Sequence, residues 1–307
     1  MSPTLVVLAP DPLLTVTVEA GPDGDDVHLH PGGQGYWIAR MAAALGAQVT
    51  LCGPFGGETG TVLRDLMGRG NLALAAVTVA ASNGAYVHDR RGGERVEVAT
   101  MRPAPLSRHD LDDLYGAALT GGLAADVTVL AGPGPWDPPV VPPETYRRLA
   151  RDLGSNQRAV VGDLSGDPLT EALAGGLRLL KLSHEELPGA PVEPAAVIAA
   201  MRRLRKEGAQ DVVVSRAADP SLALVGDRVV EVRAPRLVAV DHRGAGDSMT
   251  AGIAVALGAG ADVTEALRFG AAAGALNVTR RGLASGDRTA IESLAAEIEV
   301  RDLKEEI

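Results

Sequence analysis

Several features are scarce in this chain of 307 residues, and each scarcity excludes a class of protein. There is one cysteine, Cys52, so the chain forms no internal disulfide, which is typical of a reducing compartment. Aromatic residues make up only 3% of the sequence, so a large core must be built from aliphatic side chains. Lysine and arginine number 29 against 39 acidic residues, and the formal net charge of −10 argues against nucleic-acid or membrane-surface partners.

Long apolar runs are also missing. No apolar run reaches the roughly 18 residues that a membrane-spanning helix needs. The apolar stretch before Pro10 is too short for the core of a secretory signal. We therefore expect a cytoplasmic protein that binds a small molecule and contacts neither membranes nor nucleic acid.

What the sequence does contain is a regular alternation of short buried strands and helices. Such alternation with short connections is typical of an α/β fold, in which helices cover both faces of a mostly parallel sheet. The predicted buried strands are 5–8, 49–52, 127–130, 159–161, 177–180 and 212–214. The predicted helices are 36–45, 59–67, 110–119, 144–153, 168–174, 194–207, 246–257, 264–277 and 289–301, with a hairpin made by 222–225 and 229–232. We expect a single domain over residues 1–307.

Four further segments alternate polar and apolar residues, as half-exposed strands do. They are Leu14–Val18, Val27–His30, Ala85–His88 and Glu94–Val98. We interpret them as a small sheet, built from about residues 13–31 and 84–101, that stands off the main domain. So small a sheet needs cover on one face, from a substrate or from another subunit.

The run from Asp241 to Gly252 gives the clearest indication of a chemical function. Gly244, Ala245 and Gly246 let backbone N–H groups converge at the start of a helix, which makes an anion site. Asp247 follows directly and can take a proton from a hydroxyl that attacks a bound phosphate, which is what phosphoryl transfer requires. The alternative is that Asp247 only caps the helix.

The same segment resembles the C-terminal signature of the ribokinase/PfkB carbohydrate kinase family, Asp-Thr-x-Gly-Ala-Gly-Asp, and its continuation is closest to the phosphofructokinase-like branch. The run from Gly32 to Arg40 is similar to the N-terminal signature, Gly-Gly-Lys-Gly-x-Asn-x-Ala-Arg. Lys181 to Leu187 is similar to the family's Lys-Pro-Asn-x-x-Glu-Leu. The resemblance implies a ribokinase-like three-layer sandwich with the small sheet as a lid, an ATP- and Mg²⁺-dependent carbohydrate kinase, and a homodimer formed through the lid.

By position, the resemblance also implies a role for individual residues. Asp247 is the expected base, with Gly244, Ala245 and Gly246 as the anion hole. Glu186 is expected to act through water on Mg²⁺, and Asp241 is a candidate ligand for K⁺. The residues expected near the nucleotide are Lys181, Ser215, Ala217, Gly274 and Asn277. Those expected to face the acceptor are Asp11, Gly32, Gly33, Gln34, Trp37 and Tyr86.

Departures from the family pattern concentrate on the acceptor side. Gln34 stands where the family has lysine, Trp37 where it has a sugar-binding asparagine, and Tyr86 lies in the stretch where the phosphosugar branch has a phosphate-binding arginine. Neither Gln nor Tyr replaces the charge of Lys or Arg on a phosphate. Four of the few aromatic residues, Tyr36, Trp37, Tyr86 and Trp136, map near the acceptor, where they can stack on a sugar or pack the lid.

Several functions therefore stay open at this stage. The leading one is a kinase for a less charged acceptor, such as a free sugar, a cyclitol or a nucleoside. The alternatives are a kinase for a fructose or tagatose phosphate, and a catalytically degenerate relative that binds a metabolite. The last is favoured by four departures from the family pattern, at Gln34, Trp37, Ser183 and Ala217. A dinucleotide-binding oxidoreductase is less well supported, because the glycines from Gly32 to Gly35 lack the Gly-x-Gly-x-x-Gly spacing.

Overall fold

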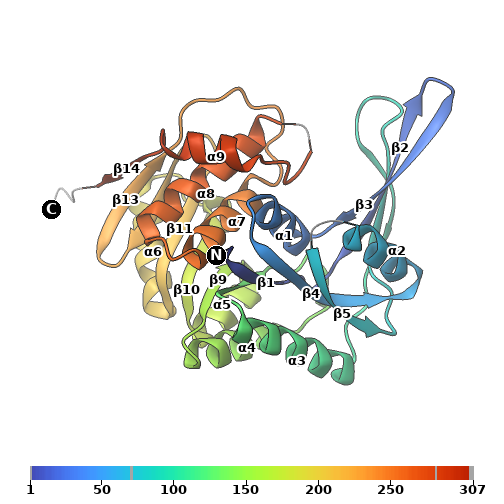
Figure 1. Cartoon of the computed structure of the whole chain (residues 1–307), viewed down its shortest axis with the longest axis horizontal. Helices are drawn as coiled ribbons and strands as arrows, with labels where there is room; N and C mark the ends of the chain where they lie inside the picture. Colours follow the sequence, from blue (N-terminus) through green and yellow to red (C-terminus); the bar gives the residue numbers. More distant parts are fainter. Residues whose placement is uncertain (1, 70–71, 281, 304–307) are drawn as a thin grey trace.

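The computed structural model describes residues 2–69, 72–280 and 282–303, and within them the main sheet has ten strands (Figure 1). Their order is β14-β13-β12-β11-β10-β9-β8-β1-β4-β5. The parallel strands are β1 (Thr4–Leu8), β4 (Gln48–Gly56), β5 (Leu72–Val79), β8 (Val127–Ala131), β9 (Ala159–Asp163), β10 (Leu177–Ser183) and β11 (Ala209–Arg216). An antiparallel edge follows, made of β12 (Asp219–Val225), β13 (Arg228–Arg233) and β14 (Glu299–Asp302).

Helices cover both faces of this sheet, so the fold is the expected α/β sandwich. One face carries α1 (Gln34–Ala44), α2 (Gly57–Gly68), α7 (Ala245–Gly258), α8 (Val263–Val278) and α9 (Arg288–Ala295). The other carries α3 (Arg108–Ala124), α4 (Glu144–Ser155), α5 (Gly166–Gly175) and α6 (Pro194–Glu207). Successive strand residues point to opposite faces, so that Val7 of β1 joins the first hydrophobic cluster and Leu8 joins the second. Two aliphatic layers therefore hold the strand ends in fixed positions.

The predicted helix 289–301 is wrong over its second half. Helix α9 stops at Ala295, the buried Ile298 anchors the connection, and residues 299–302 form β14. β14 pairs antiparallel with β13. Without β14, β13 would be the edge strand, and its outer N–H and C=O groups would have no strand partner. Pairing with a distant strand thus overrides the helical pattern. The sequence pattern also misses β5, which extends the opposite end of the sheet.

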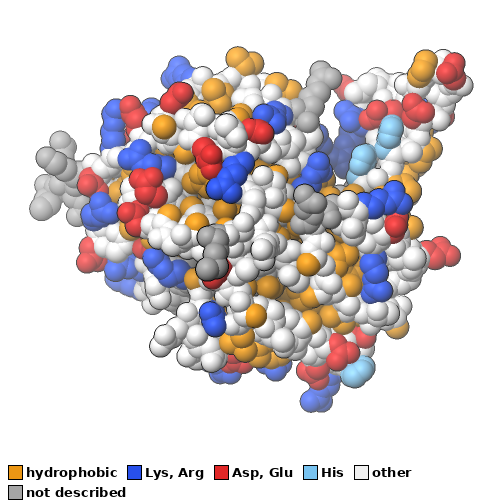
Figure 2. Space-filling model, in the orientation of Figure 1, with side chains coloured by type: hydrophobic (Ala, Val, Ile, Leu, Met, Phe, Trp, Pro, Cys, Tyr) orange, Lys and Arg blue, Asp and Glu red, His pale blue; other side chains and the backbone are white. Residues whose placement is uncertain are grey.

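The four alternating segments form a separate small sheet in the order β3-β2-β6-β7. Its strands are β2 (Leu13–Gly21), β3 (Gly24–Gly32), β6 (Ala85–Asp89) and β7 (Val96–Met101). The pairs β2–β3 and β6–β7 are antiparallel, and β2 and β6 pair in parallel. The last strand, β7, begins at Val96, two residues later than the predicted start at Glu94. In Figures 1 and 2 this sheet projects from the body.

The two faces of the small sheet differ in chemistry. Cross-strand partners share a face, and Val16 is paired with both Leu29 and Val87. Thr17 is likewise paired with His88 on the opposite, polar face, which also carries Tyr86 two residues earlier. The sheet therefore has an apolar face and a polar face.

Within the described ranges, no helix is long and apolar enough to cross a membrane.

Candidate active site

A cleft of about 390 Å³ lies at the carboxyl ends of the parallel strands, where the connections after β1, β8, β9 and β10 meet the first turns of α1 and α7. Ligand sites of open α/β sheets form at the carboxyl ends of the strands. Its described lining residues are Asp11, Leu13, Gly33, Gln34, Trp37, Gly132, Pro133, Gly134, Asp163, Ser165, Glu186 and Asp247. The cleft thus unites the predicted base, the predicted metal residue and four predicted acceptor residues.

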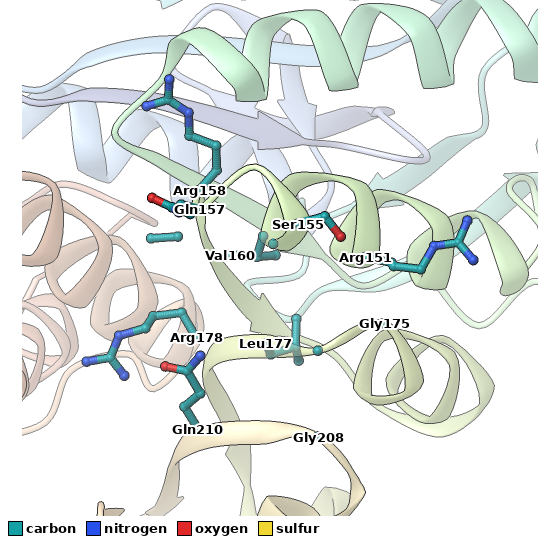
Figure 3. A pocket seen from close by; sticks show the side chains of 13 residues that line it. Arg151, Ser155, Gln157, Arg158, Val160, Gly175, Leu177, Arg178, Gly208 and Gln210 are labelled. Atoms are coloured by element: carbon teal, nitrogen blue, oxygen red, sulfur yellow. The ribbon is translucent and has the colours of Figure 1, made fainter.

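A second hollow, of about 600 Å³, opens at the amino ends of the strands, beside the first residues of β9 and β10. Figure 3 shows Arg158 and Arg178 extending to the same side of it, and Arg151 extending the other way. None of its described lining residues carries a carboxylate, so this hollow offers no general base for a hydroxyl. The acid-lined cleft is therefore the candidate active site.

Helix α7 begins at the cleft with a backbone suited to an anion. Its N-cap, Gly244, has a φ of +71°, in the left-handed region that favours glycine. A Cβ on Gly246 would lie 2.6 Å from Nζ of Lys181, so a glycine lets this cation approach the backbone closely. No described side chain caps α7, which leaves its first N–H groups and the positive end of the helix dipole to an anion.

Asp247 lies in the first turn of α7 and does not cap it, so the helix-cap alternative has no support in the structure. Burial raises the pKa of Asp247 to about 7, and the carboxylate of Asp163 adds to the rise. Lys181 and a hydrogen bond from the side chain of Gln34 lower this pKa and partly offset the rise. A carboxyl with a pKa near neutrality is well matched to general-base chemistry at that pH.

A buried ion pair lies directly behind the start of α7. Nζ of Lys181 is 3.2 Å from Oδ2 of Asp163, and both side chains are at most 5% exposed. The hydroxyl of Thr250, one turn into α7, donates to the same carboxylate at 2.5 Å. Burial works to lower the pKa of Lys181, but Asp163, Asp247 and Glu186 together raise it, so the lysine stays charged.

Sequence reasoning missed Asp163, although it lines the cleft. The signal was present, since this acid ends the buried run that begins at Ala159, and strand ends at this edge of a parallel sheet carry functional groups. The nucleotide contact of Lys181 stays a prediction. The ammonium group of Lys181 lies close to the backbone of Gly246 at the start of α7.

Glu186 is held by the 3-10 turn η1 (His184–Glu186), which follows β10. Its Oε2 accepts a hydrogen bond of 2.6 Å from the backbone N–H of Ser183, and the Ser183 hydroxyl accepts from the N–H of Glu185. Glu186 is exposed as a whole, but partial desolvation of its carboxylate raises its pKa, while Ser183 and Lys181 work to lower it. The backbone of Ser183 therefore holds the Glu186 carboxylate, and its hydroxyl caps the turn that carries Glu186.

On the acceptor side, Asp11 is buried and tied to the loop after β8. Its Oδ2 accepts hydrogen bonds from the N–H of Gly134, at 2.6 Å, and from Nε1 of Trp136, at 2.7 Å. Burial raises the pKa of Asp11 to about 6, and these two bonds limit the rise. A carboxylate held in this way is a fixed acceptor for ligand hydroxyls.

Gln34, the first residue of α1, bridges the two sides of the cleft. Its Oε1 accepts from the N–H of Gly132 at 2.6 Å, and its side chain hydrogen-bonds Asp247. Gly33, at the N-cap of α1, has a φ of +97°, and the lining includes it. Gly32, the last residue of β3, is buried but does not line the cleft.

Only some of the four aromatic residues lie at the acceptor end of the cleft. Trp37 lines the cleft, and Tyr86 of the small sheet stacks on Trp136 of the body with ring centroids 5.9 Å apart. The polar face of the small sheet is therefore turned toward the body. Tyr36 is different, because it belongs to the hydrophobic core and meets Trp37 edge-on. Its expected place at the acceptor mouth is wrong.

The other residues predicted to lie near the nucleotide are not among those that line the cleft. Ser215 ends its stretch of β11 paired with Ser183, so it lies one strand beyond η1. Ala217 has a φ of +51°, a left-handed backbone where the family carries glycine. At Gly274 of α8, a Cβ would lie 3.0 Å from the carbonyl oxygen of Ala245, so this glycine permits close packing of α8 on α7.

Asn277 and Asp241 both engage the protein itself. The Asn277 amide donates to the carbonyl oxygen of Arg243 at 2.8 Å, and its oxygen accepts from the N–H of Ala284 at 3.1 Å. Asn277 therefore joins two loops beside α7. The guanidinium of Arg243 bonds both carboxylate oxygens of Asp241, at 3.0 and 2.6 Å, and lowers the pKa of Asp241 to about 2.

Comparison with known proteins identifies the family. The model of the pfkB family carbohydrate kinases matches residues 10–290. ATP-dependent 6-phosphofructokinase isozyme 2 of Escherichia coli is 30% identical over 271 residues, which cover 85% of this chain and 86% of that protein. The 1-phosphofructokinase of Bacillus subtilis is 27% identical, over 89% of each chain.

Solved structures agree with this. Phosphofructokinase-2 from Escherichia coli in complex with potassium superposes with a TM-score of 0.84 at 26% identity, over 96% of this chain and 99% of that one. Ribokinase from Arabidopsis thaliana, solved with ribose and ATP, shares the fold with a TM-score of 0.73 at 23% identity, over 96% of this chain and 99% of that one. The signatures around Gly32 and Asp247, the ribokinase-like fold and the matched length lead to one conclusion: the chain belongs to the pfkB family of carbohydrate kinases.

Proposed function

We propose that this carbohydrate kinase transfers the γ-phosphoryl group of ATP to a hydroxyl of a sugar or sugar-like molecule, with Asp247 as the base. One observation carries the proposal. Asp247 lines the cleft from the first turn of α7, immediately after the uncapped backbone of Gly244, Ala245 and Gly246. An anion held by those N–H groups and a hydroxyl beside Asp247 are then neighbours.

The proposed reaction needs one proton transfer and one displacement. Asp247 takes the proton of the acceptor hydroxyl while that oxygen attacks the γ-phosphorus. The new oxygen–phosphorus bond forms as the bond to the β–γ bridging oxygen breaks, and ADP leaves with the electron pair. The N–H groups of Gly244 to Gly246, with the ammonium of Lys181 close to Gly246, stabilise the negative charge of the transition state.

The carboxylates of the cleft fit a magnesium ion that arrives with the nucleotide. Kinases hold Mg²⁺ through one or two carboxylates together with the phosphates. The carboxylate of Asp163 is close enough to Glu186 to raise the pKa of Glu186, and both residues line the cleft. We propose that Glu186 acts through water and Asp163 from the neighbouring strand, and that the ion supplies charge neutralisation on the transferring phosphates.

A K⁺ requirement is also proposed, with Asp241 as the candidate ligand. The phosphofructokinase-2 of Escherichia coli was solved in complex with potassium, which supports a search for the same dependence here. The bond between Arg243 and Asp241 must open before this carboxylate can bind a cation. Ser215, Ala217, Gly274 and Asn277 are proposed to shape the nucleotide side indirectly, through the loops that they hold.

For the acceptor, we propose Asp11, Gly32, Gly33, Gln34, Trp37 and Tyr86 as the surrounding residues. The relatives named 6-phosphofructokinase and 1-phosphofructokinase favour a second candidate, a kinase for a fructose phosphate. The two candidates share the same base and anion hole. They differ only in whether the acceptor already carries a phosphate.

The small sheet, within about residues 13–31 and 84–101, is proposed to act as a lid of a single domain and as the contact between two copies of the chain. Its polar face already meets the body through Tyr86 and Trp136. Its apolar face leaves Val27 63% exposed and Val98 64% exposed, which a second lid would cover. The single, buried Cys52 fits the reducing cytoplasm proposed as its location.

The test is product formation on a panel of acceptors. We expect ³¹P NMR to detect a new phosphate ester with MgATP and at least one sugar, cyclitol, nucleoside or sugar phosphate. Asp247→Asn, which keeps the size of the side chain, is the control and should form the ester at least about 100-fold more slowly. A wild-type protein that never exceeds Asp247→Asn on any acceptor would instead support a degenerate, metabolite-binding relative.

A further inference from the structure

The hollow of about 600 Å³ at the amino ends of β9 and β10, here called the amino-end hollow, has no part in the proposed reaction. Its described lining includes three arginines, Arg151, Arg158 and Arg178, and neither aspartate nor glutamate. The active-site cleft is the reverse, because its described lining has four acids and neither lysine nor arginine. On a chain with a net charge of −10, the amino-end hollow is therefore a local concentration of positive charge.

The amino-end hollow and the active site lie at opposite ends of the same strands. β9 runs from Ala159, which lines the hollow, to Asp163, which lines the cleft. At roughly 3.3 Å per residue, the two ends of this strand are about 13 Å apart. A small molecule in the amino-end hollow therefore does not compete for the groups that hold the nucleotide and the acceptor.

Arg158 is an exposed residue directly before β9. Among the described residues, none forms a hydrogen bond or an ion pair with its guanidinium group. Its charge acts only weakly on Asp126, because hydrogen bonds from Thr4 are the main cause of the lowered pKa of Asp126 and Arg158 is the smallest cause. The guanidinium of Arg158 is therefore available to a ligand.

Arg178, the second residue of β10, is held in a fixed position. Its Nη1 bonds the buried carboxylate of Asp211 on β11, which also accepts a hydrogen bond of 2.9 Å from the N–H of Gly226. This bond uses one nitrogen of the guanidinium, so Nε and Nη2 can still donate to an anion. Figure 3 shows Arg158 and Arg178 extending to the same side of the hollow. One unpaired and one fixed guanidinium thus face the same space.

Uncharged donors complete the amino-end hollow. Leu177 pairs with Ala209 and Leu179 with Asp211, so Gln210, which lies between them on β11, is next to Arg178. The side-chain amide of a glutamine can donate two hydrogen bonds without adding charge. The volume of the hollow lies within the range of roughly 300–1,000 Å³ that is usual for small-molecule sites. The hollow therefore suits a small anion that carries several oxygen acceptors.

Helices α4, α5 and α6 all end at the amino-end hollow, and arginines near helix C-termini can simply balance the helix dipoles. However, Arg158 and Arg178 lie outside the last turns of these helices. The N–H groups of Asn156, Gly176 and Gly208 already bond carbonyl oxygens at the three helix ends. Since the backbone satisfies these ends, the two arginines remain for another anion.

We propose that the amino-end hollow binds a small molecule that carries a phosphate group, with Arg158 and Arg178 as the residues that hold the phosphate. Arginine is suited to this role, because its planar group donates paired N–H bonds to phosphate oxygens. The site is separate from the kinase active site, and the inference does not depend on the proposed function.

The probe is phosphoglycolate, a phosphate monoester that has no hydroxyl group to accept a phosphoryl group. It is titrated calorimetrically into wild-type protein whose active site is filled with a non-hydrolysable MgATP analogue, after the binding of the analogue has been measured. We expect phosphoglycolate to bind with the analogue present, and to bind more weakly at high salt, because salt screens the charges. Binding that disappears when the analogue is present assigns the anion to the active site and overturns the inference, as does the absence of measurable binding.

Three variants then assign the site. Arg158→Gln should weaken phosphoglycolate binding by about 10-fold or more, because hydrogen bonds between charged groups are lost. Arg178→Lys keeps the charge beside Asp211 but removes the paired donors, so it should also weaken binding. Arg151→Gln is the matched control, since Arg151 lines the same hollow but bonds Asp152 and extends the other way in Figure 3.

The control should bind phosphoglycolate within about 3-fold of the wild type, because a distant exposed charge is screened. Thermal unfolding of each variant shows whether it is folded. If Arg151→Gln loses as much affinity as Arg158→Gln, general surface charge attracts the anion and the inference is wrong. Unchanged binding in a folded Arg158→Gln protein also overturns it.

Discussion

Burial of Asp247 has two consequences. It raises the pKa of this carboxyl, which suits a general base, and it destabilises the folded state when the carboxyl is ionised. The unfolded chain has the ordinary aspartate pKa of 3.8, and the folded protein raises it to about 7. The folded state therefore holds the proton more tightly. This contribution to stability is complete below about pH 4 and is lost as the pH rises toward 7.

The first prediction concerns the pH dependence of catalysis. Since Asp247 must be ionised to accept a proton, kcat/KM should fall below about pH 7, approaching tenfold per pH unit. A pH profile with a saturating nucleotide concentration and a limiting acceptor measures this. An acid limb centred near pH 4 would mean that Asp247 is not the titrating base, or that its environment differs from the one described.

The second prediction concerns stability. Asp247→Asn removes the buried charge, so it should raise the free energy of unfolding by about 1–2 kcal/mol at pH 8 while abolishing most activity. Urea denaturation of both proteins at pH 5 and pH 8 measures the gain, which should be larger at pH 8. An equal gain at both pH values would contradict the assigned pKa.

At the scale of elements, the pair Lys181–Asp163 joins β10 to β9, and Thr250 ties the same carboxylate to α7. The start of α7, and with it the anion site, is thus fixed to two neighbouring strands. Removing one member of a buried ion pair is costly, because the remaining charge has no partner.

The third prediction follows from this pair. Lys181→Met should lower the free energy of unfolding by about 3 kcal/mol, because it leaves Asp163 uncompensated. Adding Asp163→Asn to Lys181→Met should restore a large part of that loss. Denaturant titrations of the two single variants and the double variant form the cycle. A double variant as unstable as the sum of the single ones would show that Lys181 and Asp163 do not stabilise each other.

Much of the element pattern could be read from the sequence, because buried parallel strands and amphipathic helices have short-range periods. Residues 299–302 could not be assigned in this way, because they are a strand only through pairing with β13. Asp163 was missed for a similar reason. The sequence displays it as the end of a strand, and only the fold brings it to Lys181 and Thr250. Tyr36 was misplaced because neighbouring residues on α1 point in different directions, one to the core and one to the cleft.

At the scale of the whole molecule, the lid is the part whose surface is least explained by one copy of the chain. Val27 and Leu29 of β3 are 63% and 44% exposed, and Val96 and Val98 of β7 are 58% and 64% exposed. In Figure 2 hydrophobic side chains lie along the outer edge of the projecting sheet. Exposed apolar side chains gathered on one small sheet are typical of an interaction surface.

The fourth prediction is that this face forms the proposed dimer. The double variant Val27→Asp, Leu29→Asp should shift the sedimentation coefficient from that of a dimer to that of a monomer, because it places charges in the contact. Val192→Asp is a matched control, since Val192 is 62% exposed but lies outside the lid. A dimer that survives in the double variant, or a monomeric wild-type protein, would exclude the lid as the interface.

The central claim is that Asp247 removes the proton of the acceptor, and one measurement tests it most directly. Single-turnover rates of phosphoryl transfer should be compared for the wild-type protein, Asp247→Asn and Glu265→Gln, an exposed first-turn acid of the neighbouring helix α8. We predict that Asp247→Asn lowers the rate by about 10²–10⁴ without weakening nucleotide binding measured by calorimetry, while Glu265→Gln leaves both unchanged. A rate in Asp247→Asn within a few-fold of the wild type would contradict the account.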